Sequence, residues 1–150
     1  MTLIVDVAAD GIRVPLSARR VREVARQVLR AEGVREALLS IAFVSRRMIA
    51  ALHRKHLGAR GATDVITFAM RGSGRSPSPV IGDVYISPEV ARENARRFGS
   101  GVREELARLV VHGTLHAVGH DHPEGDARQR SPMWRRQEEL LDRARMSGAW

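Results

Sequence analysis

Four of the six histidines lie within eleven residues, in the stretch VHGTLHAVGHDHP at 111–123. His112 and His116 are four residues apart, so on a helix their imidazoles leave the same face and can bind one ion. Gly119 is suited to end that helix with a sharp turn, which would return His122 to the same ion. Three nitrogen ligands leave one position of a tetrahedral zinc open for water, as in catalytic sites. We therefore predict one Zn²⁺ per chain, used hydrolytically.

The stretch resembles the metalloprotease pattern H-E-x-x-H only in part. Gly113 stands where that pattern has its glutamate base, which counts against proteolysis. A pair of histidines four residues apart is also common in ordinary helices, so the metal prediction depends on the added Gly119 and His122. The chain has no cysteine, and three imidazoles without a carboxylate cluster suit zinc better than magnesium or calcium.

The residues around the three histidines have less certain roles. His120 is expected to face solvent from a loop. Asp121 could orient an imidazole or could simply form a turn. Asp121, Asp64 and Asp83 are the candidates for a general base, and each has an alternative structural role.

Composition indicates a globular protein with a basic surface. The chain has 150 residues, of which 43% are hydrophobic and 28% charged, and its formal net charge is +8. All its basic residues except Lys55 are arginines, which favours a polyanionic partner such as RNA but could also reflect a GC-rich genome. No apolar run approaches the length of a membrane span, and no signal peptide is evident, so we expect a cytoplasmic protein without a membrane partner.

The elements that must position the histidines alternate along the chain. We expect an α+β fold in a single domain over 1–150, with a small mixed sheet of about four strands packed with about five helices. A Gly/Ser/Pro-rich loop is expected over 71–79. The expected strands cover 2–8, 37–44, 64–68 and 80–86, and the expected helices cover about 18–32, 46–57, 88–98, 102–118 and 131–146.

Three blocks of the sequence resemble the YbeY family. HGTLHAVGHDH at 112–122 is similar to the family signature HGxLHLxGYDH, TDVITF at 63–68 to its TDVLSF strand, and GDVYIS at 82–87 to its GDI-type strand. The resemblance implies a metal-dependent endoribonuclease, specific for single-stranded RNA, that acts in ribosomal RNA maturation and ribosome quality control. It also implies that His112, His116 and His122 bind the zinc, and that the partner is ribosomal RNA or the small ribosomal subunit.

One position departs from the family pattern. Many members carry a stretch like LNxxYRGxxxP before the TDV block, and here Leu57 stands at the position of its arginine. An arginine there could bind a scissile phosphate, whereas leucine cannot. Arg54 and Arg60 are nearby but do not occupy the motif position, so the role is not transferred to either.

Two rival functions remain open from the sequence. The chain could be a zinc hydrolase of peptides or small amides, although the missing glutamate weakens that reading. It could instead be a ribosome-assembly module that binds RNA through its basic surface and holds a mainly structural metal.

Overall fold

The structure is a computed structural model that describes residues 1–58, 61, 63–70 and 79–150. The expected elements are all present, with ends shifted by one or two residues. The expected loop over 71–79 lies, apart from Pro79, outside the described residues, as does Arg60. In chain order the elements are β1 (Thr2–Ala8), α1 (Ala18–Ala31), β2 (Glu36–Phe43), α2 (Arg46–Leu57), β3 (Val65–Met70), β4 (Val80–Ile86), α3 (Pro88–Phe98), α4 (Val102–Val118), the 3₁₀ helix η1 (Gly125–Arg130) and α5 (Pro132–Met146).

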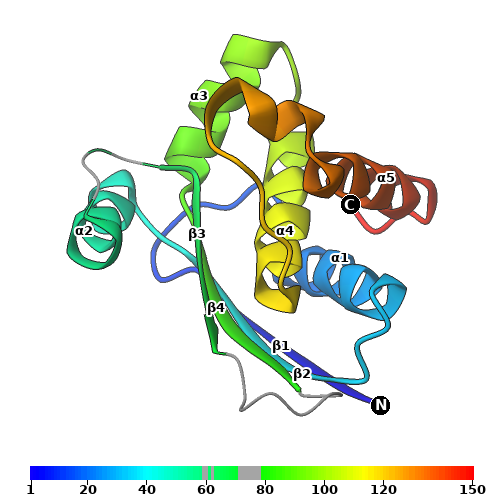
Figure 1. Ribbon diagram of the computed structural model, residues 1–150. Helices are drawn as coiled ribbons and strands as arrows, with labels where there is room; N and C mark the ends of the chain where they lie inside the picture. Colours follow the sequence, from blue (N-terminus) through cyan, green and yellow to red (C-terminus); the bar gives the residue numbers. More distant parts are fainter. Residues whose placement is uncertain (59–60, 62, 71–78) are drawn as a thin grey trace.

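The four strands form one mixed sheet in the order β1-β2-β4-β3. β1, β2 and β4 are parallel, and β3 is antiparallel to β4 at one edge. Helices α1, α4 and α5 lie on one face of the sheet, while α2 lies on the other side, next to β3 (Figure 1). This is the α+β fold with a small mixed sheet that the sequence predicted.

The main hydrophobic core lies between the sheet and the helices on that face. Leu39, Ile41 and Phe43 alternate along β2 and are buried, as their period of two requires for strand residues on one face. Most of α4 is buried as well, including Leu106, Val110 and Leu115. Helix α4 is therefore the central helix, and residues on it are held rigidly.

Helix α4 approaches the sheet closely at two glycines. A Cβ on Gly113 would lie 2.5 Å from Cγ1 of Val84, and a Cβ on Gly82 of β4 would lie 3.3 Å from Cβ of Ala117. Both distances are shorter than ordinary van der Waals contact, so these positions have no room for larger side chains. The close packing fixes the height of α4 above β4 and places its histidines near β3.

Serine side chains cap four of the helices at their N-termini. Ser17, Ser45 and Ser87 accept hydrogen bonds from backbone N–H groups of the first turns of α1, α2 and α3, and Ser131 does the same for α5. The sequence did not predict η1, which connects the metal-binding stretch to α5. Within the described residues, no helix has the length and apolar character needed to cross a membrane.

Candidate metal centre

The structure brings His112, His116 and His122 together. One ring nitrogen from each lies within 4.8 Å of the others, and Nε2 of His112 is 3.1 Å from Nε2 of His116. Two ligands about 2.0–2.1 Å from one tetrahedral metal ion would be separated by roughly 3.3 Å, which is close to the separation of the His112 and His116 nitrogens. The three side chains could therefore hold a metal.

A turn at Gly119 returns His122 to the two histidines of α4. Gly119 has a φ of 123°, a value that favours glycine. The N–H groups of Gly119 and His120 both donate to the carbonyl of Leu115, at 3.1 and 3.0 Å, and so close the last turn of the helix. The segment after α4 then runs back along the helix toward η1 (Figure 1).

Each of the three imidazoles has an oxygen acceptor at Nδ1. Nδ1 of His112 donates to Oε1 of Gln137 at 2.6 Å, and Nδ1 of His116 donates to the carbonyl of His120 at 2.9 Å. Nδ1 of His122 lies 2.9 Å from the carbonyl of Pro123. Because a carbonyl oxygen only accepts, the proton of each neutral ring is held on Nδ1 and the lone pair on Nε2. The three rings are thus set in the tautomer that a metal requires.

Burial keeps two of these imidazoles neutral. Burial lowers the pKa of His112 to about 3, although the hydrogen bond to Gln137 opposes this shift. Electrostatic interactions with the His116 imidazole and the Arg128 guanidinium lower the pKa further. Burial also lowers the pKa of His116, although its hydrogen bond to the His120 carbonyl opposes the shift. Neutral imidazole is the form that binds metal, so the site is prepared for a cation near neutral pH.

The centre opens into a cleft of about 520 Å³ between α4, β3, α2 and the segment that carries η1. The described lining includes the three histidines, Leu57 and Arg128. Nη2 of Arg128 lies 3.5 Å from Nε2 of His112. A metal bound here would be accessible from this cleft, as a catalytic metal must be.

The candidate general bases have different positions. Asp121 is 91% exposed, and its Oδ1 is 3.8 Å from Nδ1 of His116, which is farther than the carbonyl that accepts from this nitrogen. Asp64 lines the cleft, and its Oδ2 accepts from Nδ2 of Asn94 at 3.2 Å. Asp83 is exposed and neighbours Val84, which faces α4, so its side chain points to the opposite face of the sheet. Of the three, Asp64 and Asp121 reach the cleft.

Of the two arginines suggested by the sequence, the structure describes Arg54. Arg54 is exposed on α2 and does not line the described part of the cleft, and Arg60 lies outside the described residues. Leu57 does line the cleft, at the position where the family motif has its arginine.

The expectation for His120 was wrong. Its side chain is 32% exposed, and its Nε2 forms a hydrogen bond with Oε1 of Glu32, at the end of α1. Arg136 of α5 also contacts Glu32, at 2.9 Å. His120 therefore helps to attach the turn after α4 to two other helices, through a contact across 88 residues that local sequence patterns do not reveal.

Two residues at the centre were missed by the sequence analysis. Gln137 is almost fully buried, and its own amide donates to Oε2 of Glu138 at 3.1 Å, which orients its carbonyl toward His112. Arg128 extends into the cleft from η1. Both come from segments after the histidine stretch, and no spacing in the sequence marks them as its neighbours.

The geometry at Gly113 bears on the choice of reaction. Because a Cβ here would overlap Val84, a glutamate base in the H-E-x-x-H position has no room. The Thr67 hydroxyl donates to the Gly113 carbonyl at 3.2 Å, which ties this turn of α4 to β3. The centre therefore lacks both the base of a zinc peptidase and the space for one.

Comparisons with known proteins show which family the chain belongs to. The family model described as Endoribonuclease YbeY matches residues 8–145. A protein of Pelotomaculum thermopropionicum named Endoribonuclease YbeY is 38% identical over 128 residues, which cover 82% of this chain and 83% of that protein. One of the same name from Thermobifida fusca is 37% identical and covers 91% of each chain.

A solved structure supports the fold independently. The solution structure of TM1509 from Thermotoga maritima aligns with a TM-score of 0.62 over 97% of this chain and 95% of that one, at 22% sequence identity. At this identity the likeness supports the fold alone. The match of the family model over most of the chain, together with the identity to these relatives, shows that the chain belongs to the YbeY family of endoribonucleases.

Proposed function

We propose that this chain is a zinc-dependent endoribonuclease that cleaves single-stranded RNA in the cytoplasm and acts in ribosomal RNA maturation and ribosome quality control. Its membership of an endoribonuclease family supports an RNA-cleaving hydrolase. The observation that carries the proposal is the cluster of three histidines, one ring nitrogen of each lying within 4.8 Å of the others, in the wall of an open cleft. His112, His116 and His122 would hold one Zn²⁺.

Residues around the three histidines would orient the metal ligands and accept a proton during the reaction. A bound zinc supplies a Lewis acid that activates water or polarises a phosphoryl oxygen. Gln137 and the carbonyls of His120 and Pro123 hold the three rings in place. Asp64, which lines the cleft, is our candidate for the carboxylate that would accept a proton from an incoming nucleophile. The missing space at Gly113 disfavours the rival peptidase function.

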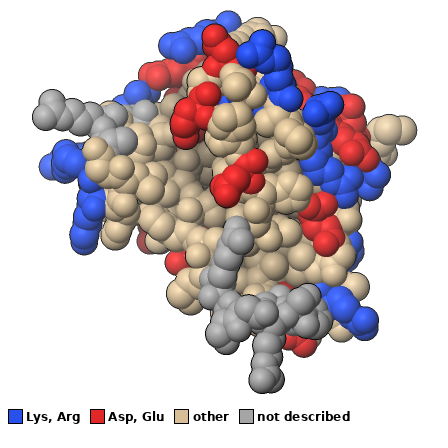
Figure 2. Space-filling model, viewed as in Figure 1, with Lys and Arg blue, Asp and Glu red and all other residues tan. Residues whose placement is uncertain are grey.

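The charge of the surface is consistent with local contacts to RNA. Figure 2 shows basic residues toward the edges of one face, separated by acidic groups, and a largely uncharged middle. The net charge of +8 therefore does not form one continuous patch on this face. RNA binding here would depend on particular arginines and would weaken with salt.

Metal content and RNA cleavage test the proposal together. Purified protein should contain about one zinc per chain, and should cleave single-stranded RNA until a chelator is added. His116→Ala should lose both the metal and the cleavage, while His56→Ala should lose neither, because His56 packs on Phe68 outside the three-histidine set. Retention of metal by His116→Ala would exclude the site. A metal-loaded wild type that binds ribosomal RNA without cutting it would support the assembly-module alternative.

A further inference from the structure

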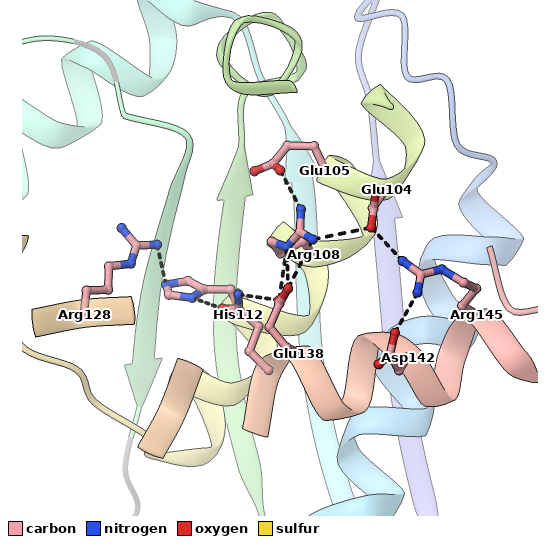
Figure 3. A network of polar contacts seen from close by, with 9 residues as sticks. Glu104, Glu105, Arg108, His112, Arg128, Glu138, Asp142 and Arg145 are labelled. Carbon is pink, nitrogen blue, oxygen red and sulfur yellow. Dashed lines mark hydrogen bonds and ion pairs between the residues drawn. The ribbon is translucent and has the colours of Figure 1, made fainter. Parts of the chain in front are cut away.

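Arg128 extends from η1 toward the metal centre without an acidic partner. Its Nη2 lies 3.5 Å from Nε2 of His112, and its Nε is buried without a hydrogen-bond partner (Figure 3). Among the residues that the structure describes, no carboxylate forms an ion pair with it. A guanidinium in this position is costly, because burial keeps water from its Nε–H donor and no described residue accepts a hydrogen bond in place of that water.

Metal binding would remove the hydrogen-bond acceptor that Nη2 of Arg128 has in the metal-free protein. Nη2 of Arg128 points at the lone pair on Nε2 of His112, which is also the lone pair that a metal would take. Once a cation holds that lone pair, Nη2 loses its acceptor and two positive groups face each other. An anion between them satisfies both, because guanidinium N–H groups donate to phosphate oxygens.

On the other side of the cleft, none of the described lining residues is an arginine or lysine. Leu57 lines it from α2 at the position of the family's arginine, and it is 57% exposed. Arg108, which borders an adjoining cleft, is already bound by Glu104, Glu105 and Glu138. Among the described residues that line the metal cleft, Arg128 is the one arginine.

We propose that Arg128 binds the scissile phosphate of the RNA, and that it does so from η1 in place of the arginine absent at position 57. Arg128 contacts the substrate directly and balances charge as it develops on the phosphoryl oxygens. The assignment rests on the proposed endoribonuclease function, but phosphate binding can be measured apart from cleavage.

The test compares Arg128→Ala and Arg128→Lys with Arg130→Ala, an exposed arginine on the same 3₁₀ helix. Each protein is titrated with a 2′-O-methyl oligouridine, whose integrity is checked afterwards, with zinc and with chelator. In the zinc-loaded protein Arg128→Ala should bind the oligouridine about tenfold more weakly than wild type. The slope of the logarithm of the binding constant against the logarithm of the salt concentration should be shallower by about 0.7, the value for one phosphate contact to a single strand. Arg128→Lys should be intermediate, and Arg130→Ala should stay within about twofold of wild type.

Cleavage and a rescue variant complete the experiment. The kcat for RNA should fall about 100-fold in Arg128→Ala, the scale of losing one donor to a developing charge. Leu57→Arg in the Arg128→Ala background should restore part of the affinity and of kcat, because it returns a guanidinium to the same cleft. Circular dichroism establishes that each variant is folded, and Arg128→Lys provides the comparison if the alanine variant is not.

The outcomes separate this assignment from the proposed function. If wild type cleaves RNA and folded Arg128→Ala matches Arg130→Ala in binding and kcat, the assignment is overturned. If wild type never cleaves but Arg128→Ala alone loses oligouridine affinity, the nuclease proposal fails while the phosphate site stands. An effect of Arg128→Ala that is equal with zinc and with chelator contradicts the shared position of phosphate and metal.

Discussion

Two arginines lie on opposite sides of His112, and the protein neutralises only one of them (Figure 3). Arg108 of α4 contacts Glu105 at 2.9 Å, Glu138 of α5 at 3.1 Å and Glu104 at 3.5 Å. Arg128, on the cleft side, has a weak contact to His112 and no acidic partner among the described residues. Both side chains are partly buried, so burial alone does not distinguish them.

The contacts of the two arginines define two sides of the metal centre. On the side of Arg108, which we call the holding side, protein groups fix the His112 ring, whereas the cleft side, with Arg128, faces the space for a ligand. On the holding side, His112 donates to Gln137, Gln137 donates to Glu138, and Glu138 accepts from Arg108. Every donor in that chain has an acceptor. On the cleft side, the structure describes no carboxylate that accepts from Arg128, so its donors remain available to a ligand. An arginine without an acidic partner, close to one that has three, is thus a stronger sign of a binding role than the high arginine content of the whole chain.

The largest expected effect comes from His112, the residue that the two sides share. We predict that His112→Ala cleaves RNA several orders of magnitude more slowly, because the variant loses the metal and with it roughly several kcal/mol of transition-state stabilisation. It should still bind structured RNA within roughly tenfold of wild type, about 1.4 kcal/mol, because most arginine–phosphate contacts remain. Single-turnover cleavage and filter binding measure the two quantities.

The folding of this variant must be verified by circular dichroism, because loss of a metal can itself unfold a small domain. A folded, metal-free His112→Ala that cuts at the wild-type rate would place the activity elsewhere.

The next effect concerns the holding side. We predict that Arg108→Met lowers the free energy of unfolding by about 2 kcal/mol, because it leaves Glu105 buried without a cation. The value is below that of a fully buried pair, since Glu138 and Glu104 retain access to solvent. Urea denaturation measures the change. Arg143→Ala, which removes an exposed pair with Glu139, serves as the control and should change the free energy by less than about 0.5 kcal/mol.

A pH effect should follow from the burial of His112. Its folded pKa is lowered to about 3, below the value near 6.5 of the unfolded chain, so the unfolded state binds more protons between these values. In chelated protein, the free energy of unfolding should therefore fall with decreasing pH from about 6.5, with a contribution from this group approaching 1.4 kcal/mol per pH unit.

Comparing the pH dependence of wild type and His112→Ala isolates that contribution from the carboxylates. Equal slopes for the two proteins between pH 6.5 and 5 would contradict a buried, neutral His112.

The smallest effect concerns the cleft side. We predict that Arg128→Ala lowers the free energy of unfolding of the metal-free protein by no more than about 0.5 kcal/mol, because no ion pair within the described residues is broken and a buried donor without a partner is removed. The same urea titration that detects Arg108→Met measures it. A loss as large as that of Arg108→Met would mean that the two arginines serve the same structural purpose.

The order of the elements and the three-histidine cluster could be predicted from local information. Alternation along β2, serine caps such as Ser17, and the four-residue spacing of His112 and His116 all act within one or two turns. What brings Gln137 to His112, or Glu32 to His120, is the packing of α5 and α1 on α4. Such contacts depend on distant segments, so the spacing of residues in the sequence does not show them.

The departures from the expected site have the same origin. Arg128 reaches the cleft because η1, a short 3₁₀ helix without a strong hydrophobic period, turns the chain before α5. Asp83 was a candidate base from its place in a motif, but the strand period directs it away from α4.

The contact between Gly113 and Val84 also limits which sequences can be reached by single substitutions. A glutamate at position 113 would collide with β4 unless Val84 were shortened first, and that change would open a cavity in the core. A path toward peptidase-like chemistry on this scaffold thus needs two changes in a fixed order, the first harmful by itself. We expect a library randomised at position 113 alone to return glycine, whereas one randomised at both positions admits larger residues at 113 only beside a smaller residue at 84.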